Sequence, residues 1–311
     1  MEIRQLGNSS LKVSSICLGG NVFGWTIDEA TSFAVLDAFV AGGGNFIDSA
    51  DVYAAWAEKP GISETILGKW MVARGNRANI VVATKLGSKM PGGEGLGRAW
   101  MIRAVEDSLK RLQTDYIDLY QSHQFDEKTP QEETLRAFDE LVKQGKVRVI
   151  GNSNFNGTRT AEALAISKQH GLVRYESAQP KYNLVDREEF ERDLAPVLIA
   201  NNVSCIPYYA LAAGFLSGKY RAGEELPKTP RAGGVSSRYM NEKGFAVLSQ
   251  LEGAANRLSA SMSQAAVAWL MYAPSVTAPI ASATSVAQVH ELISASQIPK
   301  YAVAEAFALH V

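Results

Sequence analysis

The chain has 311 residues, of which 46% are hydrophobic and 20% are charged, an ordinary composition for a folded protein with a large buried core. Its 31 lysines and arginines nearly balance its 32 aspartates and glutamates, and the net charge is -1. This balance gives no electrostatic reason to expect a nucleic acid or an anionic membrane as partner. No linker rich in Pro, Gly or Ser divides the chain, so we expect one domain over residues 1–311.

The cysteines and the amino terminus bear on the cellular compartment. Cys17 and Cys205 each lie in an apolar run, which favours two buried thiols in a reducing compartment over a disulfide. The first ten residues lack the basic and apolar stretches of a secretory signal peptide. No segment approaches the roughly 20 apolar residues of a membrane-spanning helix. We therefore expect a cytoplasmic protein.

Short apolar or β-branched runs recur along the chain, and a helical pattern follows most of them. A Gly-Asn-Ser-Ser turn at 7–10 joins two short extended runs, which predicts an N-terminal hairpin. Eight further runs predict strands, near residues 15–19, 46, 80, 117, 148, 175, 203 and 277. Between the third and fourth, Met101, Val105, Leu109 and Leu112 recur at helical spacing.

Eight strands alternating with helices predict a (β/α)8 barrel, the TIM barrel, of the α/β class. The interval between the seventh and eighth strands is longer than the others. Its polar stretch at 217–237 contains Gly and Pro and predicts a long loop.

Several common binding motifs are missing. No G-x-G-x-x-G sequence occurs, so the dinucleotide-binding fingerprint of open α/β sheets is absent. The stretch GFLSGKY at 214–220 is one residue short of a P-loop, and Tyr220 stands where Ser or Thr would bind magnesium. The four histidines show no metal-ligand spacing, so we expect no metal site.

Functional side chains of such a barrel come from the carboxyl ends of its strands. Asp48 and Tyr53 follow the second predicted strand, Lys85 ends the third and His123 ends the fourth. Singly, an Asp or Lys at a strand end is usually part of an ion pair, and a lone His usually belongs to the core. Barrel geometry brings these neighbouring ends together, which favours a shared function.

The four residue types suit the reduction of a carbonyl group. Hydride addition leaves negative charge on the carbonyl oxygen, and a tyrosine hydroxyl can protonate that oxygen. A lysine cation lowers the pKa of a nearby tyrosine, and Asp48 can hold the lysine in its charged form. His123 can orient the carbonyl and stabilise the developing charge.

Three segments resemble motifs of the aldo-keto reductase family. NFIDSADVY at 45–53 resembles the motif with the catalytic aspartate and tyrosine, VVATKLG at 81–87 the lysine strand, and LYQSHQFD at 119–126 the histidine strand. GNSNF, ESAQPKYN, GFLSGKY and TAPIASATSVAQ continue the resemblance in family order over nearly the whole chain. The resemblance points to the bacterial members, related to the potassium-channel β-subunit branch. It implies a tetrad of Asp48, Tyr53, Lys85 and His123 and a reversible, NAD(P)H-dependent reduction of aldehydes or ketones, with the proton from Tyr53.

The same resemblance implies three sets of cofactor-binding residues. The nicotinamide end would lie on Ser153, Asn154, Gln179 and Tyr208, whose ring would stack on the nicotinamide. The pyrophosphate would lie within the segment that contains Leu211, Gly214, Leu216, Gly218 and Lys219, where glycines permit close approach. The adenosine end would lie on Ser282, Thr284, Gln288 and Glu291. Alternatively, Ser153 or Asn154 could cap a helix, and Tyr208 could belong to the core.

Two residues of the eighth loop depart from the family pattern. Ser282 stands where a glycine is common, and Leu292 stands where an asparagine often follows the glutamate. This loop has no Arg or Lys for a 2′-phosphate, a charge that Arg231 or Arg238 could supply. The family favours NADP(H), with NAD(H) possible.

The loops after the first, second and fourth strands line the substrate pocket of the family. Phe23, Trp25, Trp56 and Phe125 lie on these loops and imply a flat apolar or aromatic carbonyl substrate, although each could equally pack its own loop. Two alternative functions stay open: a lyase or aldolase that uses Lys85 in a Schiff base, and a cofactor-binding subunit without catalysis. The sequence leaves the physiological substrate, the direction of the reaction and the oligomeric state open.

Overall fold

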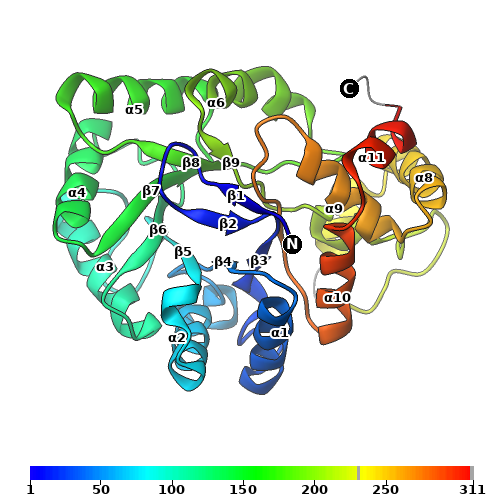
Figure 1. Ribbon diagram of the computed structural model, residues 1–311, viewed down its shortest axis with the longest axis horizontal. Coiled ribbons are helices and arrows are strands. Elements are labelled where there is room, and N and C mark those ends of the chain that lie inside the picture. The colour runs from blue at the N-terminus through cyan, green and yellow to red at the C-terminus, as the bar shows by residue number, and fades with distance from the viewer. Residues whose placement is uncertain (230–231, 309–311) are drawn as a thin grey trace.

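An eight-stranded parallel sheet curls into a barrel with helices on its outer side (Figure 1). The computed structural model describes residues 1–229 and 232–308. The strands follow one another in the order β10-β3-β4-β5-β6-β7-β8-β9. Their bounds are β3 (Cys17–Gly19), β4 (Phe46–Asp48), β5 (Val81–Leu86), β6 (Ile117–Ser122), β7 (Val147–Ser153), β8 (Tyr175–Gln179), β9 (Ser204–Cys205) and β10 (Ile280–Ala281). These are the eight predicted strands.

The two edges of the sheet meet and close the barrel. The amide of Cys205 donates to the carbonyl of Ser275, and the amide of Thr277 donates to the carbonyl of Cys205, both at 2.8 Å. The amide of Ile280 donates to the carbonyl of Pro207 at 2.8 Å. The predicted barrel is confirmed.

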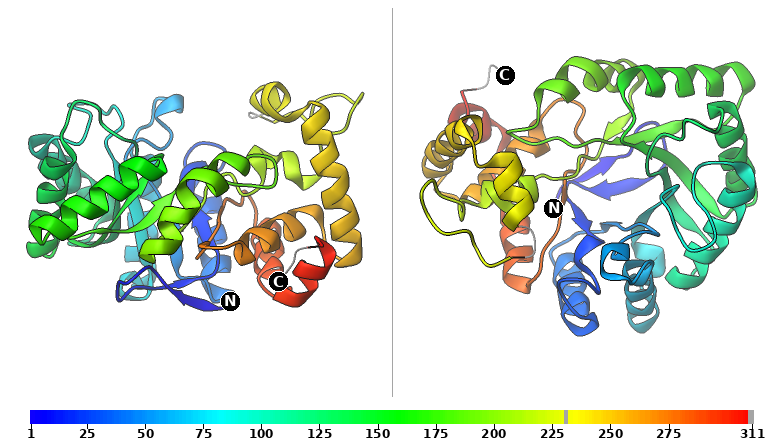
Figure 2. Two further views of the ribbon diagram at one scale, coloured as in Figure 1. Left: turned by 90° about the horizontal axis from the view of Figure 1, so that it is seen from above. Right: turned by 180° about the vertical axis from the view of Figure 1, so that it is seen from behind.

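A two-stranded antiparallel hairpin, β1 (Ile3–Gln5) and β2 (Lys12–Ser14), covers the amino-terminal end of the barrel (Figure 2). Its turn is bound to the barrel, because the amide of Gly7 donates to Ser204 Oγ at 2.7 Å and the amide of Asn8 to Glu176 Oε2 at 2.8 Å. Gly7 has a φ of +54°, and a Cβ there would lie 2.5 Å from the carbonyl oxygen of Glu176. The predicted hairpin is confirmed, and it needs glycine at this turn.

Helices cover the outer face of the sheet. They are α1 (Glu29–Ala41), α2 (Ile62–Arg74), α3 (Arg98–Leu112), α4 (Gln131–Lys143), α5 (Gly157–His170), α6 (Ala195–Asn201) and α10 (Val286–Ala295). The last helix, α11 (Lys300–Ala306), packs on the helices between β9 and β10. Four short helical turns join them to the strands: η1 (Gly20–Val22), η2 (Ala55–Ala57), η3 (Arg77–Asn79) and the π-helical η4 (Phe190–Leu194). In α3, the four apolar residues at helical spacing are all buried: Met101, Val105, Leu109 and Leu112.

The chain between β9 and β10 forms η5 (Ala212–Ser217), α7 (Ala232–Tyr239), α8 (Glu242–Arg257) and α9 (Met262–Tyr272), which lie to one side of the barrel (Figure 2). The loop predicted over 217–237 is confirmed for residues 218–229, which form neither helix nor strand. From Ala232 onward the structure differs, because Tyr239 stacks on Phe215 with ring centroids 5.7 Å apart. This tertiary contact outweighs the poor helix propensity of Gly233 and Gly234.

Side-chain alternation along the strands decides what lies inside the barrel. Leu18, Ile47 and Val82 point outward into the layer under the helices, and Cys17, Phe46 and Ala83 belong to the separate cluster that fills the interior beneath the hairpin. Asp48 and Lys85 follow Phe46 and Ala83 by two residues. The alternation therefore directs both polar side chains into the barrel, above an apolar floor.

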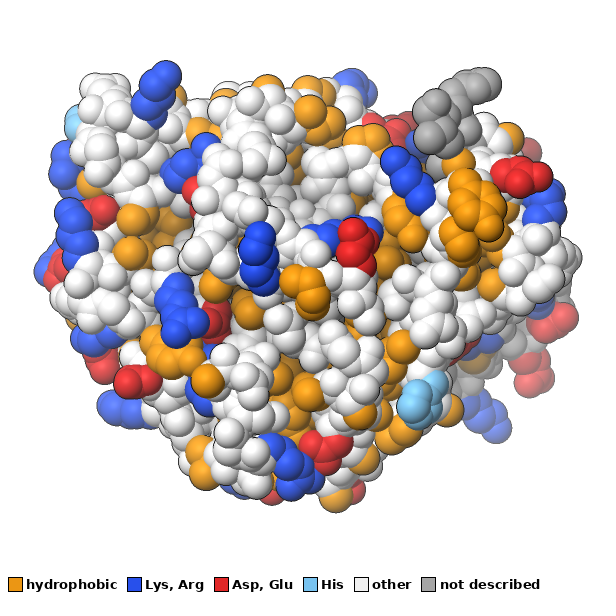
Figure 3. Space-filling model, in the orientation of Figure 1, with side chains coloured by type: hydrophobic (Ala, Val, Ile, Leu, Met, Phe, Trp, Pro, Cys, Tyr) orange, Lys and Arg blue, Asp and Glu red, His pale blue; other side chains and the backbone are white. Residues whose placement is uncertain are grey.

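The surface on the hairpin side carries Lys, Arg, Asp and Glu interspersed, with single hydrophobic side chains between them (Figure 3). Within residues 1–229 and 232–308, no helix has the length and apolar character needed to cross a membrane. Cys17 and Cys205 are both buried and unpaired.

Candidate active site

Three of the four predicted catalytic side chains form a tight hydrogen-bonded group at the carboxyl ends of β4 and β5. Lys85 Nζ lies 2.7 Å from Asp48 Oδ2 and 2.7 Å from the Tyr53 hydroxyl oxygen. The Tyr53 hydroxyl donates to Asp48 Oδ2 at 2.9 Å. The ring of His123 lies beside Tyr53, with centroids 6.2 Å apart. The structure thus brings together all four residues that the sequence analysis singled out.

Asp48 and Lys85 are almost completely buried, and neighbouring groups use their remaining hydrogen-bonding capacity. Lys85 Nζ also donates to the carbonyl of Ser49 at 2.8 Å, so three acceptors surround the amine. Gln179 Nε2 donates to Asp48 Oδ1 at 2.9 Å and lies 3.3 Å from Gln121 Oε1. The sequence analysis missed Gln121 and Ser49. Alternation along β6 could have indicated Gln121, because it follows the inward-pointing Leu119 by two residues. These contacts hold the ion pair in one geometry.

Burial shifts the pKa values of Tyr53 and Lys85. Burial and the Asp48 carboxylate raise the pKa of Tyr53 well above its ordinary value. The pKa of Tyr53 is thus raised overall, and not lowered as the nearby lysine alone would predict. Burial lowers the pKa of Lys85, and Asp48 opposes that shift. Tyr53 accordingly keeps its proton near neutral pH.

His123 is neutral at physiological pH. Burial, and then the Lys85 cation, lower its pKa to about 3. Its Nδ1 lies 3.3 Å from the hydroxyl of Ser88. A neutral imidazole can offer one N–H to a ligand oxygen.

Asp51 is a further buried acid, and its amide donates to the carbonyl of Lys85 at 3.2 Å. Among the described residues, neither of its carboxylate oxygens has a hydrogen-bond partner. Burial and the neighbouring Glu64 carboxylate raise its pKa to about 8, against the effect of Arg111. Glu64 itself pairs with Arg111 at 2.7 Å. The sequence analysis missed this residue, although Asp51 lies within the ADVY segment.

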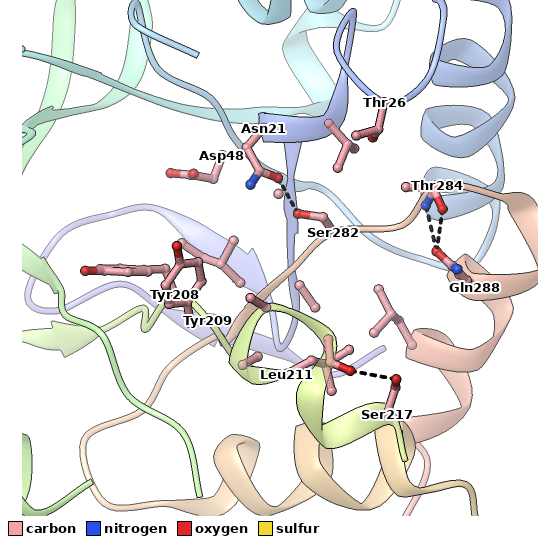
Figure 4. A pocket seen from close by; sticks show the side chains of 18 of the residues that line it. Asn21, Thr26, Asp48, Tyr208, Tyr209, Leu211, Ser217, Ser282, Thr284 and Gln288 are labelled. Atoms are coloured by element: carbon pink, nitrogen blue, oxygen red, sulfur yellow. Dashed lines mark hydrogen bonds between the residues drawn. The ribbon is translucent and has the colours of Figure 1, made fainter. Parts of the chain in front are cut away.

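A cavity of about 690 Å³ runs from the tetrad to the loop after β10 (Figure 4). Asp48, Tyr53 and His123 line one end of it. Eleven of the predicted cofactor-binding residues also line it: Ser153, Asn154, Gln179, Tyr208, Leu211, Gly214, Lys219, Ser282, Thr284, Gln288 and Glu291. Leu216 is buried in the core instead, and Arg231 lies outside the described residues.

The end of the cavity near the tetrad is held by hydrogen bonds between strand ends. Ser153 Oγ donates to the carbonyl of Gln179 at 2.8 Å, and the Tyr208 hydroxyl donates to Asn154 Oδ1 at 2.8 Å. Asn154 has a φ of +59°, and its Nδ2 donates to the carbonyl of His123 at 2.9 Å. The cap of α5 is Asn156, whose side chain accepts from the amide of Arg159. Ser153 and Asn154 therefore do not cap this helix.

The loop after β9 turns sharply along the wall of the cavity. Ala212, Ala213 and Gly214 have φ values of +47°, +56° and +100°, a left-handed run that only glycine adopts without strain. Gly218 also has a positive φ, and a Cβ there would lie 2.5 Å from Met262 Sδ. Gly218 thus lets the loop approach α9, and Gly214 lines the cavity.

The far end of the cavity lies at the amino-terminal end of α10. Gln288 Oε1 accepts from the amide of Thr284 at 2.8 Å, and Glu291 Oε1 accepts from the Ser261 hydroxyl at 2.5 Å. Arg238, on α7, is exposed and is not among the residues that line the cavity. Burial, with Tyr209 and Asp186, raises the pKa of Tyr208 to about 12, and Arg238 opposes this rise. Arg238 is thus within electrostatic range of Tyr208.

The four aromatic residues predicted for a substrate pocket lie in different surroundings. Trp56 lines the cavity with 52% of its surface exposed, and its ring meets Trp25 edge to face at 5.3 Å. Phe125 packs against Phe155 at 5.3 Å, away from this pair. Phe23 is fully buried in the core. The two tryptophans are thus the aromatic pair beside Tyr53.

The barrel brings an Asp, a Lys, a Tyr and a His together at one end of a long cavity. The model of the Aldo/keto reductase family matches residues 15–309, and the chain belongs to this family. The family assignment supports an oxidoreductase that acts on carbonyl groups with a nicotinamide cofactor. In the part of the chain that the structure describes, no group of three or more His, Cys, Asp or Glu residues could hold a metal ion.

Relatives of similar length carry two kinds of description. The chain is 32% identical over 306 residues to the uncharacterized oxidoreductase YrpG of Bacillus subtilis (strain 168), covering 96% of this chain and 92% of that protein. It is also 32% identical over 307 residues to a probable voltage-gated potassium channel subunit beta of Oryza sativa subsp. japonica, with the same coverage. A protein of the same description from Arabidopsis thaliana is 31% identical over 307 residues, again covering 96% and 92%.

Proposed function

We propose that the protein reduces aldehydes and ketones to alcohols with NADPH, in a reversible reaction for which Tyr53 supplies the proton. The observation that carries the proposal is the Asp48–Lys85–Tyr53 group, joined at 2.7 to 2.9 Å at the end of the long cavity. A half-buried tyrosine hydroxyl that faces the cavity and is bonded to an ammonium group is suited to give a proton to an alkoxide-like oxygen.

The residues present fit a nicotinamide dinucleotide. The cavity is long and, at about 690 Å³, within the usual range for ligand sites. Polar side chains lie at both ends, and Gly214 lines the wall between them. We propose that Ser153, Asn154, Gln179 and Tyr208 hold the nicotinamide, and that Thr284, Gln288 and Glu291 hold the adenosine end. Bound nicotinamide supplies the hydride.

Side chains of the protein would donate the proton and stabilise the charge that is left behind. Tyr53 donates it to the carbonyl oxygen, and the phenolate left behind is stabilised by Lys85 at 2.7 Å. Asp48 and the carbonyl of Ser49 keep Lys85 in place. Neutral His123 directs an N–H toward the same carbonyl oxygen and orients the substrate.

We propose further that Arg231 binds the 2′-phosphate and gives the preference for NADPH over NADH. In our proposal Arg231→Ala weakens NADPH about ten- to a hundredfold and leaves NADH nearly unchanged, because one charge-assisted contact is lost. Calorimetric titration with both cofactors measures this. An equal loss of affinity for both cofactors would mean that Arg231 binds the pyrophosphate and not the 2′-phosphate.

For the substrate, we propose a flat apolar or aromatic carbonyl compound that lies against Trp56, with Trp25 behind it. The exposed face of Trp56, next to Tyr53, supports this choice. We also propose that residues 1–311 act as one domain in the cytoplasm, and the unpaired thiols of Cys17 and Cys205 support a reducing compartment.

A steady-state assay with benzaldehyde, and with both cofactors in turn, tests the proposal. We expect the absorbance of NADPH to fall only when enzyme and aldehyde are both present. A lyase or aldolase would instead form a Schiff base at Lys85, which borohydride would trap as a stable adduct in the presence of a carbonyl ligand. Adduct formation without cofactor consumption would overturn the oxidoreductase assignment.

A further inference from the structure

The loop after β5 carries a serine, Ser88, whose hydroxyl oxygen lies 3.3 Å from His123 Nδ1. The two residues follow neighbouring strands, β5 and β6. The amide of His123 donates to the carbonyl of Leu86 at 2.8 Å, which fixes its backbone against the end of β5. His123 lines the cavity and Ser88 does not, so the serine contacts the imidazole outside the space that a ligand would fill.

The loop that carries Ser88 is closed on itself and tied to the loop after β6. The amide of Gly95 donates to the carbonyl of Gly87 at 2.9 Å. In the loop after β6, Asp126 Oδ2 accepts from the amide of Leu96 at 2.8 Å. Gly95 has a φ of +84°, and a Cβ there would lie 2.6 Å from Asp126 Oδ2, so the close approach of the two loops needs glycine. These contacts hold Ser88 beside the imidazole.

A neutral imidazole has one nitrogen that donates and one that accepts. The hydrogen bond made by one nitrogen sets which of them carries the proton. Because the pKa of His123 is lowered to about 3, its imidazole is neutral at physiological pH. The contact with Ser88 therefore bears on the tautomer of His123.

The hydroxyl of Ser88 has one proton to donate. Within residues 1–229 and 232–308, His123 Nδ1 is the acceptor that the structure gives it. If Nδ1 carried the imidazole proton, it would donate to the serine oxygen, and the hydroxyl would lose this acceptor. Both groups are satisfied when Ser88 donates, Nδ1 accepts and the imidazole proton is on Nε2.

We infer that Ser88 is a positioning residue for His123: its hydroxyl donates to Nδ1, keeps the proton on Nε2 and so presents an N–H to a carbonyl oxygen in the cavity. With Nδ1 occupied by Ser88, Nε2 is the nitrogen left for a ligand. The other tautomer would turn a lone pair of Nε2 toward the carbonyl oxygen, and the two would repel each other. The consequence for catalysis rests on the proposed function, whereas the tautomer does not.

Nitrogen-15 NMR measures the tautomer without cofactor or turnover. The chain has four histidines, and the pair of imidazole signals that disappears in His123→Ala belongs to His123. At pH 7 we expect a protonated Nε2 and an unprotonated Nδ1. A protonated Nδ1 in the unchanged protein would overturn the inference.

Ser88→Ala tests whether the hydroxyl acts on the imidazole. The Nδ1 signal should move toward that of an unprotonated nitrogen without a hydrogen bond. Ser88→Thr keeps the hydroxyl and should retain the original signal. Lys89→Ala, an exposed position in the same loop, should leave the signal unchanged and is the matched control. An unmoved Nδ1 signal in Ser88→Ala would show that the serine only serves the loop.

Steady-state kinetics tests the consequence for catalysis. Ser88→Ala should lower kcat/KM for benzaldehyde about two- to tenfold, the effect of one neutral hydrogen bond, and leave the dissociation constant of NADPH unchanged. In a His123→Ala background it should cause no further loss, since it acts through the imidazole. A further loss there would overturn the positioning role.

The two measurements separate this inference from the proposed function. If the unchanged protein reduces no aldehyde, the proposed function fails, and the NMR signals of His123 still decide its tautomer. If the unchanged protein reduces benzaldehyde and Ser88→Ala changes neither the Nδ1 signal nor kcat/KM, only this inference fails.

Discussion

Tyr53 holds a proton between a cation and an anion. Its oxygen accepts from Lys85 at 2.7 Å, and its hydroxyl donates to Asp48 at 2.9 Å. Its raised pKa keeps the proton in place until an acceptor arrives. In the proposed reaction, the carbonyl oxygen of the substrate would replace Asp48 as that acceptor.

Tyr53→Phe tests this role with little change in shape. The ring and its packing stay, but the proton donor is lost, so kcat should fall about 10²–10⁴-fold. The dissociation constant of NADPH should hardly change, which serves as the control for folding. More than about a tenth of the wild-type kcat, in an enzyme limited by hydride transfer, would contradict the assignment.

Asp51 should make the free energy of unfolding depend on pH. Its pKa rises from an ordinary 3.8 to about 8 in the folded protein, so the folded state holds this proton more tightly than the unfolded chain. The chain is therefore progressively destabilised as pH rises from about 4 to about 8, at about 1.4 kcal/mol per unit of pKa difference. Above that range both states are ionised, and the penalty stays constant.

Asp51→Asn should remove this penalty, because the amide stays neutral at every pH. We expect the variant to be more stable than wild type at pH 8 and to lose most of that advantage at pH 5. Urea unfolding at the two pH values measures the difference. An equal gain at both values would show that the carboxyl is not titrating in this range.

At the scale of elements, α2 and α3 touch at a glycine. A Cβ at Gly68 would lie 2.4 Å from the carbonyl oxygen of Arg111 and 2.7 Å from that of Leu112. The Glu64–Arg111 ion pair joins the same two helices. Gly68 therefore lets the helices approach each other while the buried pair forms.

Gly68→Ala should destabilise the protein, although alanine is the better helix former. Overlap with rigid backbone costs about 1–3 kcal/mol, more than the gain of up to about 1 kcal/mol in helix propensity. Gly253→Ala in α8 is the matched control, since its Cβ would meet only the side chain of Arg257 at 3.5 Å. That change should stabilise the protein in the same urea unfolding experiment. If both substitutions stabilise the protein, α2 and α3 can move apart at no cost in free energy, and the prediction for Gly68 is wrong.

At the scale of the whole molecule, the cavity joins distant parts of the chain. Its lining comes from the ends of β3, β4, β7, β8 and β10 and from the loops after β3, β4, β6, β7, β9 and β10. A ligand that fills it would tie together the two strands whose backbone bonds close the barrel, β9 and β10. Binding should therefore stabilise the fold as a unit.

Saturating NADPH should raise the melting temperature by several degrees. A ligand at a hundred times its dissociation constant stabilises the folded state by about 2.7 kcal/mol, and for a chain of this size each kcal/mol moves the midpoint by about 2–4 °C. Differential scanning fluorimetry with NADPH and NADH measures both shifts. No shift with either cofactor would remove the basis of the proposed reaction.

Much of the architecture could be predicted from local sequence patterns. Strands, helices and the hairpin turn follow from the spacing of apolar residues and from Gly7, because these signals act within a few residues. The convergence of Asp48, Lys85 and His123 also followed, since strand-end residues of a barrel share one rim. Alternation along β4 and β5 turns Asp48 and Lys85 inward for the same local reason.

Other features depended on contacts between residues far apart in the sequence. The helix at Ala232–Tyr239 forms because Tyr239 packs on Phe215, and Phe23 is drawn into the core. The raised pKa of Tyr53 results mainly from burial, which depends on the whole barrel. The sequence pattern predicts that a lysine lies near Tyr53, but it does not predict how deeply the tyrosine is buried. Ser88 and His123 meet only because β5 and β6 are neighbours. Local pattern determined the elements, the residues at their ends and the inward direction of Asp48 and Lys85. Burial and long-range packing, which exist only in the closed barrel, decided the contacts and the protonation of these residues.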